Sequence, residues 1–315
     1  MIATLTMNPA LDLTLVFGQV HLGRLNRTEA VHRHPSGKGI NVAVVLHRLK
    51  VAVRAYCLLG GETGTYIEKE LSRWGLPLAV VPIPGETRTN VKVIESAEES
   101  RMTELNSAGP PVSGDKLAEI KAKILGDLVS GDLAVLSGSL PAGVPVAFYG
   151  ELAGELARQE VKAVVDASGE ALRVALRHRP YLVKPNRQEA EELLGVAVGN
   201  SDEAVGAAAA IQALGAENVL LSLGAAGAVL LAGGDEGGGG VWWASSPPVA
   251  VQGTAGCGDS LLAGVVAGRE MGCSWPQSLR WGLAAATAAA RLPGTTLPGY
   301  EQIVAELGKV EVRAV

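Results

Sequence analysis

The chain has 315 residues with 27 lysines and arginines against 32 acidic residues, a net charge of −5, and only three cysteines. It carries no basic run or aromatic-interleaved basic patch, which argues against a nucleic-acid partner. Its cysteines are too few and too scattered for a disulfide framework or a CxxC metal site. No apolar run approaches the roughly 18 residues of a membrane helix, and the first segment lacks a basic start. We therefore expect a cytoplasmic protein with no membrane partner.

Short apolar segments alternate with helical patterns along most of the chain. The predicted strands are "IATLTM", "VAVRAYCLL", "LAVVPI", "LAVLSG", "VKAVVDA", "YLVKPN" and "NVLLSLG", and the predicted helices include residues 40–49, 116–129, 145–159 and 202–214. Apolar strands without alternation, each followed by a helix, are typical of a parallel sheet covered on both faces. The predicted fold class is α/β, doubly wound and mostly parallel, in one domain of residues 1–315.

Two stretches in the first third break this rhythm. Residues 11–34 and 89–105 alternate apolar and polar side chains, and the second has a polar, turn-like centre with no helix after it. Both predict antiparallel hairpins. We expect them to form a small antiparallel β lid, built from about residues 11–34 and 88–106, over the carboxyl edge of the main sheet, where ligands bind in such folds. The stretch "GGDEGGGG", residues 233–240, predicts a surface hairpin loop.

The segment "VQGTAGCGDSLLAG", residues 251–264, has the glycines of a phosphate-binding loop but no lysine. A P-loop requires GxxxxGK[ST], but here the position that meets the helix is an acid, Asp259. With a helix from Leu261 onward, backbone amides at its N-terminus would form an anion site that needs no cation. Asp259 would then accept the proton of an attacking hydroxyl; alternatively, it is a helix-capping acid. The amides in question belong to Ala255, Gly256, Cys257 and Gly258.

A second glycine turn opens a helix at "HPSGKGINVAVVL". Gly39 follows Lys38 where a P-loop demands Ser or Thr, so this is not a Walker motif. The turn would let the backbone approach a sugar, with Lys38 and Asn41 supplying hydrogen bonds. The alternative is an ordinary helix N-terminus with an exposed lysine.

Two further patterns combine polar side chains on one face. In "KPNRQEAEELLG", Asn186 and Glu189 are three residues apart at the start of a helix, which suits a hydrated Mg²⁺ or, alternatively, a capping box. In "TRTNVKV", alternation places Arg88, Asn90 and Lys92 on one strand face, which suits a substrate phosphate or, alternatively, a solvated surface. Asp12 follows the first strand in "NPALDLT".

Together these segments resemble the ribokinase-like (PfkB) sugar kinase family over nearly the whole chain. The resemblance is to the hexose-phosphate branch, which contains 1-phosphofructokinase and tagatose-6-phosphate kinase. The segments that carry it are "TLTMNPALDLT", "LGRLNRTEAVHRHPSGKGINVAVVLHRL", "TRTNVKV", "TELNSAGP", "LSGSLPAGV", "KPNRQEAEELLG", "SLGAAGAVLL", "GTAGCGDSLLAGVVAG" and "GTTLP".

The resemblance implies a role for each matching residue. Asp259 would be the catalytic base, and the amides of residues 255–258 would form the anion hole. The sugar-binding residues would be Asp12, Gly37, Lys38 and Asn41, with Arg88, Lys92 and Ser139 near the phosphate that the substrate already carries. The nucleotide-binding residues would be Lys184, Asn186, Ser222, Gly224 and Gly227, together with Gly256 and Gly258 of the loop, and Asn186 and Glu189 would hold Mg²⁺ through water.

The expected activity follows from these roles. It is ATP-dependent phosphorylation of a ketohexose monophosphate, with fructose 1-phosphate favoured over tagatose 6-phosphate and fructose 6-phosphate. ATP and Mg²⁺ are the expected cofactors, and a monovalent cation near the loop is a further candidate. A homodimer is expected through the lid, whose apolar faces need cover. A non-catalytic sugar-phosphate sensor remains the alternative that ATP turnover decides, whereas a nicotinamide dehydrogenase is disfavoured because no GxGxxG follows a predicted strand.

Two departures from the family pattern keep side chains small. Ser36-Gly37 stands where the family has a glycine pair, and the loop has Cys257 where the family often has alanine in VGAGDS. Cys257 is either a buried small residue or a reactive thiol whose pKa the helix N-terminus lowers.

Overall fold

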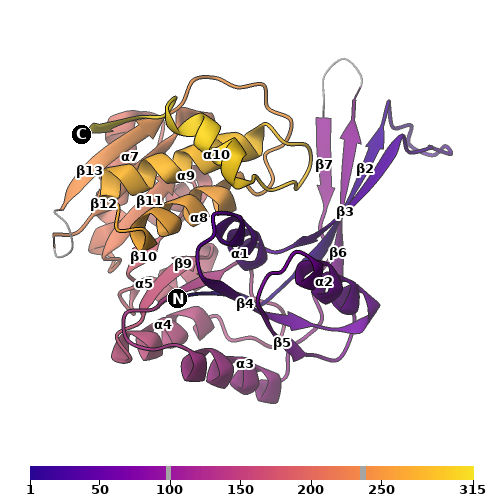
Figure 1. The fold of residues 1–315 in the computed structure, drawn as a ribbon, viewed down its shortest axis with the longest axis horizontal. Coiled ribbons are helices and arrows are strands. Elements are labelled where there is room, and N and C mark those ends of the chain that lie inside the picture. Colours follow the sequence, from indigo (N-terminus) through magenta and orange to yellow (C-terminus); the bar gives the residue numbers. More distant parts are fainter. Residues whose placement is uncertain (97–100, 235–238) are drawn as a thin grey trace.

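The computed structural model describes residues 1–96, 101–234 and 239–315, which form a ten-stranded and a four-stranded sheet with ten α-helices (Figure 1). The order of the large sheet is β5 (Leu78–Pro82), β4 (Val53–Leu59), β1 (Ile2–Thr6), β8 (Leu133–Ser137), β9 (Lys162–Asp166), β10 (Leu182–Val183), β11 (Asn218–Ser222), β12 (Ala228–Ala232), β13 (Gly240–Ser245) and β14 (Glu311–Ala314). The strands from β5 to β11 are parallel, and β12 to β14 continue the sheet antiparallel. The predicted doubly wound, mostly parallel sheet is confirmed.

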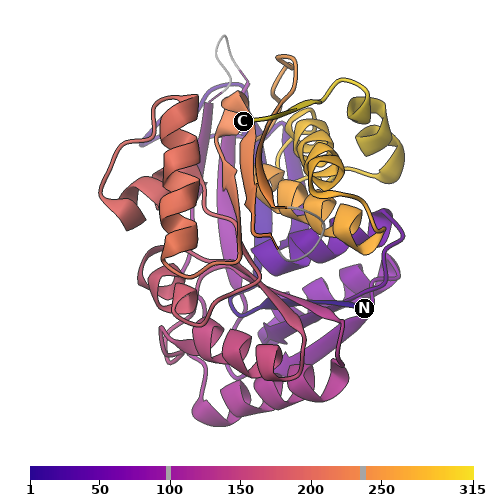
Figure 2. The same ribbon diagram turned by 90° about the vertical axis from the view of Figure 1, so that its left-hand side faces the viewer.

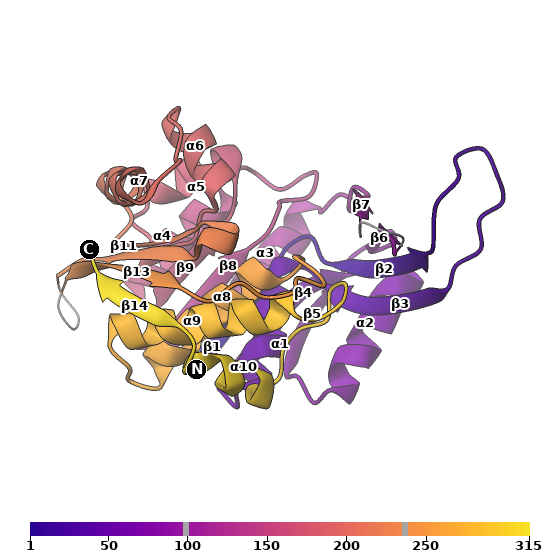
Figure 3. The same ribbon diagram turned by 90° about the horizontal axis from the view of Figure 1, so that it is seen from above.

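Helices cover both faces of the large sheet, as the views in Figures 2 and 3 show. One face packs against α1 (Lys38–Arg48), α2 (Gly61–Arg73), α8 (Cys257–Glu270), α9 (Trp275–Ala290) and α10 (Tyr300–Leu307). The other packs against α3 (Gly114–Asp127), α4 (Phe148–Arg158), α5 (Gly169–Leu176), α6 (Arg187–Leu194) and α7 (Ser201–Ala213). Two apolar cores therefore flank the sheet, which explains why its central strands are apolar on both sides. None of the helices in the described ranges is long and apolar enough to span a membrane.

The four-stranded sheet, which we call the lid, has the order β3-β2-β6-β7. Its strands are β2 (Ala10–Phe17), β3 (Ala30–Ser36), β6 (Arg88–Glu95) and β7 (Arg101–Leu105). Both predicted antiparallel hairpins are confirmed, and a parallel pairing of β2 with β6 joins them. The chain enters the lid directly after β1 and β5, so the lid starts from the carboxyl edge of the large sheet (Figures 1 and 3).

Two predicted loops fall partly outside the described residues. The polar centre of the second lid hairpin includes residues 97–100, and the "GGDEGGGG" loop includes residues 235–238. The strands on either side of the latter, β12 and β13, pair antiparallel as a hairpin requires.

Candidate active site

The polar residues predicted as a site gather at the carboxyl edge of the parallel strands. Asp166 ends β9, Lys184 follows β10, and Ser222 ends β11. The N-termini of α1 and α8 bring Lys38 and Asp259 to the same edge, where Lys38 pairs with Asp166. Ligands of doubly wound sheets bind outside this edge.

Asp259 lies in the first turn of α8. This helix begins at Cys257, four residues earlier than predicted, because Gly256 takes the left-handed conformation (φ 79°) and lets the chain turn directly into the helix. The Asp259 carboxylate does not cap the helix. Its Oδ2 instead accepts a hydrogen bond of 2.7 Å from Asn41 Nδ2.

The environment of Asp259 makes it a weaker acid than an exposed aspartic acid. The side chain is only 8% exposed. Burial, and next the negative charge of Asp166, raise the pKa of Asp259 to about 6, while the hydrogen bond from Asn41 opposes the shift. The group is therefore mostly ionised at neutral pH, yet its pKa is close enough to 7 for effective proton transfer.

Asp166 and two lysines form a buried ionic cluster beside Asp259. Lys38 Nζ lies 2.9 Å from Asp166 Oδ1 and 3.7 Å from Glu189 Oε1, and Lys184 Nζ lies 3.3 Å from Asp166 Oδ2. Burial alone would raise the pKa of Asp166, but Lys184 and Lys38 hold it below its ordinary value. Burial would lower the pKa of Lys38, but Asp166, Glu189 and Asp259 raise it. The predicted sugar ligand Lys38 thus faces two carboxylates, Asp166 at the end of β9 and Glu189 in the first turn of α6.

Sequence reasoning missed Asp166. Its signal was present, because an acid that ends a central apolar strand of a parallel sheet points to the ligand-binding edge.

Glycine is required where α1 meets β1. A methyl group at Gly39 would lie 2.5 Å from Thr6 Oγ1, and Gly37 has φ 128°. Close approach of the two elements therefore places Lys38, between these glycines, at the sheet edge.

On the lid side, Asp12 is the centre of a second buried network. Its Oδ1 accepts a hydrogen bond of 3.1 Å from Asn90 Nδ2. Its Oδ2 lies 2.7 Å from Lys92 Nζ and accepts a 2.9 Å bond from the Thr295 hydroxyl. The predicted phosphate ligand Lys92 is thus ion-paired with Asp12 in this structure. Thr295 was not predicted.

Arg88 and Ser139 meet at Asn8, another residue that sequence reasoning missed. The Arg88 guanidinium donates to Asn8 O at 3.0 Å and to Ser107 O at 3.1 Å. The Asn8 side-chain amide donates to Ser139 Oγ at 3.0 Å. The predicted grouping of Arg88 with Ser139 is therefore seen, with Asn8 between them.

Three buried side-chain amide oxygens of the candidate site have no hydrogen-bond partner among the described residues. They belong to Asn8, Asn41 and Asn90, which neighbour Arg88, Asp259 and Asp12 respectively. Buried acceptors without partners are costly, and a ligand rich in hydroxyl donors would satisfy them. The arrangement suits a polyol.

Asn186 and Glu189 form the capping box that was the alternative interpretation of their spacing. Asn186 Oδ1 accepts from Glu189 N, and Glu189 Oε2 accepts from Asn186 N, both at 2.8 Å. The second oxygen of Glu189 faces Lys38. The described residues hold no cluster of three or more histidine, cysteine or acidic side chains suited to a metal. One carboxylate and one amide nevertheless fit Mg²⁺, which keeps several waters and substrate phosphates as ligands.

The predicted nucleotide residues lie next to this capping box. Ser222 forms an isolated parallel β-bridge with Asn186. The turn after it has positive φ at Gly224 (61°) and Gly227 (102°), and a methyl group at Gly227 would lie 2.0 Å from Ala244 O. The backbone of this turn is therefore held against β13, beside the start of α6.

The Cys257 thiol is not activated. Burial, followed by the charge of Asp259, raises the pKa of Cys257 to about 11, and the thiol lies 3.7 Å from Gly253 O. The hypothesis of a pKa lowered by the helix N-terminus is wrong, because burial and the neighbouring Asp259 carboxylate raise it.

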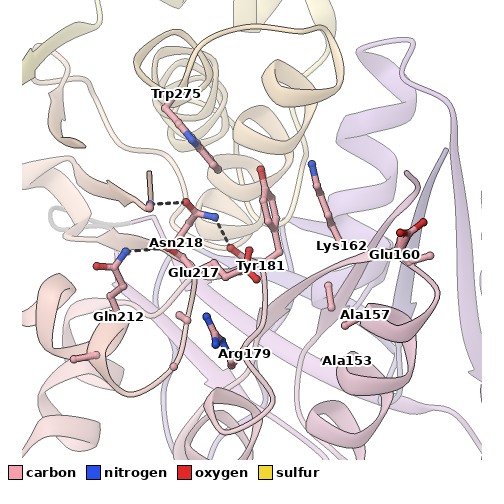
Figure 4. A pocket seen from close by; sticks show the side chains of 16 residues that line it. Ala153, Ala157, Glu160, Lys162, Arg179, Tyr181, Gln212, Glu217, Asn218 and Trp275 are labelled. Atoms are coloured by element: carbon pink, nitrogen blue, oxygen red, sulfur yellow. Dashed lines mark hydrogen bonds between the residues drawn. The ribbon is translucent and has the colours of Figure 1, made fainter. Parts of the chain in front are cut away.

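A cavity of about 730 Å³ lies at the opposite edge of the sheet (Figure 4). Its lining includes Lys162 and Asn218, which begin β9 and β11, whereas the site above lies at the ends of these strands. Asn218 and Gln212 hydrogen-bond the backbone oxygens of Tyr181 and Glu217 there. This cavity is separate from the candidate active site.

Comparison with known proteins gives consistent matches. The profile of the pfkB family of carbohydrate kinases matches residues 6–302. The 1-phosphofructokinase of Bacillus subtilis is 34% identical over 290 residues, 92% of each chain. That of Escherichia coli K12 is 32% identical over 312 residues, 99% of this chain and 98% of the relative. A crystal structure of phosphofructokinase-2 from Escherichia coli, in complex with substrates and products, superimposes with a TM-score of 0.90 at 30% identity, covering 98% of each chain.

Proposed function

Because this chain belongs to the pfkB family of carbohydrate kinases and is an ATP-dependent sugar kinase, we propose that it phosphorylates a ketohexose monophosphate, with fructose 1-phosphate as the preferred acceptor. The product would be fructose 1,6-bisphosphate. The observation that carries this proposal is Asp259: a buried carboxylate with a pKa of about 6 in the first turn of a helix. It sits at the carboxyl edge of the sheet, held by Asn41.

In the proposed reaction, Asp259 removes the proton from the acceptor hydroxyl as its oxygen attacks the γ-phosphorus. The O–P bond to the acceptor forms while the bond to the ADP oxygen breaks, and Asp259 ends the step protonated. Asn41 holds Oδ2 of Asp259, so that Oδ1 is left to face the hydroxyl. A general base of this kind contributes about 10²- to 10⁴-fold in rate.

The backbone at the start of α8 would stabilise the transferring group. Amides of residues 255–258 surround the N-terminus of α8, where the helix dipole favours an anion. A methyl group at Gly258 would lie 3.5 Å from Lys184 Nζ, so the ammonium group is next to the same spot. Amides and ammonium together would offset negative charge on the phosphoryl oxygens.

Asn186 and Glu189 are the residues that would hold Mg²⁺ through water. Bound there, the ion would neutralise charge on the nucleotide's phosphates as a Lewis acid. Ser222, Gly224 and Gly227 would place the nucleotide beside it. Lys38 and Lys184 lower the pKa of Asp166, so that an ionised carboxylate lies next to the site of the phosphates.

The lid would bind the sugar phosphate. Asp12 and the three unpartnered amide oxygens supply acceptors for sugar hydroxyls, and Arg88 with Ser139 supplies donors for the existing phosphate. Lys92 would act through Asp12, with which it is paired. The choice of fructose 1-phosphate over tagatose 6-phosphate or fructose 6-phosphate rests on the names of the relatives described above.

The lid also supports the proposal of a homodimer. In the loop between β2 and β3, Leu22 and Leu25 are 93% and 79% exposed, and Val31, Met102 and Leu105 on the strands of the lid are exposed as well. A second lid with the same surface would cover them in a two-fold contact.

The proposal is tested by following the phosphorus of both substrates by ³¹P NMR, with Mg²⁺-ATP and fructose 1-phosphate. We expect ADP and a second sugar phosphomonoester signal in equal amounts. ATP consumption that yields ADP and inorganic phosphate, or no consumption, would contradict it.

A further inference from the structure

The turn between α9 and α10, residues 291–299, packs against both the lid and the loop that precedes α8. On the lid side, a methyl group at Gly294 would lie 3.3 Å from Thr14 Oγ1 of β2. On the other side, a methyl group at Gly253 would lie 2.8 Å from Gly294 O, and one at Gly256 would lie 2.9 Å from the Leu297 side chain. This turn is therefore a shared support for two parts of the site that are far apart in sequence.

From this turn the Thr295 hydroxyl reaches Asp12 and Lys92. It accepts a 2.8 Å hydrogen bond from Lys92 Nζ and donates a 2.9 Å hydrogen bond to Asp12 Oδ2. A hydroxyl has one hydrogen, so these directions use its only donor. All three side chains are at least nine-tenths buried: Asp12 and Thr295 are 2% exposed and Lys92 5%. Water therefore has little access to replace either bond.

The acceptor count of Asp12 explains what this hydroxyl does. An ionised carboxylate has about four acceptor positions. Lys92 and Thr295 use Oδ2, and Asn90 uses one position on Oδ1. The remaining acceptor position is on Oδ1, and the direction in which it points depends on how the contacts to Oδ2 orient the carboxylate. Lys92 and Asn90 both come from β6 of the lid, so Thr295 is the contact that fixes the carboxylate relative to the rest of the site.

We propose that Thr295 is a positioning residue for sugar binding. Its hydroxyl orients Asp12 so that the free acceptor on Oδ1 faces the sugar, and it does so from the turn that also packs against the loop at the start of α8. This inference rests on the proposed function, in which Asp12 binds the sugar. It predicts that loss of the hydroxyl weakens sugar binding and leaves nucleotide binding unchanged, because among the described residues the hydroxyl bonds Asp12 and Lys92 and none of those proposed for ATP.

The test compares Thr295→Val, which keeps the shape and removes the hydroxyl, with Thr295→Ser, which keeps the hydroxyl. For Thr295→Val we expect the KM for fructose 1-phosphate to rise about tenfold or more, since the lost hydrogen bonds involve charged groups. The KM for ATP should stay within about twofold. Thr295→Ser should stay close to wild type in both. Isothermal titration with the sugar phosphate alone should give the same ordering of affinities.

The outcomes separate this inference from the function on which it rests. If wild type neither binds nor phosphorylates fructose 1-phosphate, tagatose 6-phosphate or fructose 6-phosphate, both fail. If wild type is active but Thr295→Val matches it, or if the valine variant raises both KM values together, only the positioning role is overturned. Should Thr295→Val not fold, Thr295→Cys replaces it, since a thiol keeps a similar shape but is a weak donor; an unchanged sugar KM in that variant would also refute the role.

Discussion

Replacement of Asp259 by Asn should make the enzyme slower and the fold more stable. Asparagine keeps the shape and can still accept the hydrogen bond from Asn41, but it cannot take a proton from the acceptor hydroxyl. Loss of a general base costs about 10² to 10⁴ in rate, so turnover should fall at least a hundredfold while both substrates still bind.

The gain in stability follows from the raised pKa. Burial and Asp166 raise the pKa of Asp259 from 3.8 to about 6 on folding, a difference that corresponds to about 3 kcal/mol. The unfolded chain ionises first, so the stability contributed by Asp259 is fully present below pH 3.8 and is lost as the pH rises through 6. Asp259→Asn should therefore be more stable than wild type by about 3 kcal/mol at pH 8 and by little near pH 4.

Two assays on the same preparations check this reasoning. Steady-state ADP release gives turnover, and thermal unfolding at pH 4 and pH 8 gives the stability difference. A gain of this size should raise the Tm at pH 8 by on the order of 5 °C. Turnover within tenfold of wild type would refute the role of Asp259 as base. An unchanged or lower Tm at pH 8 would refute the burial of an unfavourable charge.

Three further predictions follow from the site and the lid. The acid limb of the pH profile of kcat/KM should have its midpoint near pH 6. Asn41→Ala should move this midpoint upward, because it removes the hydrogen bond that favours the Asp259 carboxylate. A downward shift of the midpoint would contradict the assignment of Asp259 as the titrating base. Cys257 should react with iodoacetamide at pH 7 at least a hundredfold more slowly than an exposed cysteine, as followed by mass spectrometry, because its pKa is about 11; fast labelling would show an active thiol. Leu25→Asp in the β2–β3 loop of the lid should convert dimers to monomers in sedimentation velocity at micromolar concentration. Val129→Asp, at a residue that is also exposed (66% against 79% for Leu25) but lies outside the lid, should not; a wild-type monomer would contradict the lid interface.

The elements of the fold were predictable because each has a local pattern. Strands such as β1 and β8 are buried on both faces since two helical layers cover them, and the lid strands β2 and β6 alternate because only one of their faces is fully buried. The start of α8 was misplaced by four residues, because Gly256, Cys257 and Gly258 are poor helix formers and conceal its first turn. β10 is short because Pro185 closely follows it and has no amide hydrogen to donate.

The parts of the site that sequence reasoning missed depend on contacts between distant segments. Thr295 lies 283 residues from Asp12, and no local spacing relates them. Asp166 ends an apolar strand, but the pattern does not say that Lys38 and Lys184 come from two other elements to meet it. The glycine turn around Lys38 was predicted correctly. The direction of the long Lys38 side chain, however, is set by the carboxylates of Asp166 and Glu189, which come from other elements.

The central claim is phosphoryl transfer to a ketohexose monophosphate, and kcat/KM for three acceptors tests it most directly. Purified enzyme with Mg²⁺-ATP is assayed for ADP release with fructose 1-phosphate, tagatose 6-phosphate and fructose 6-phosphate, each at concentrations spanning its KM. We predict turnover that depends on the sugar, with the highest kcat/KM for fructose 1-phosphate. A higher value for either other sugar would contradict the preferred acceptor, and no sugar-dependent ADP release with any of them would contradict the proposed function.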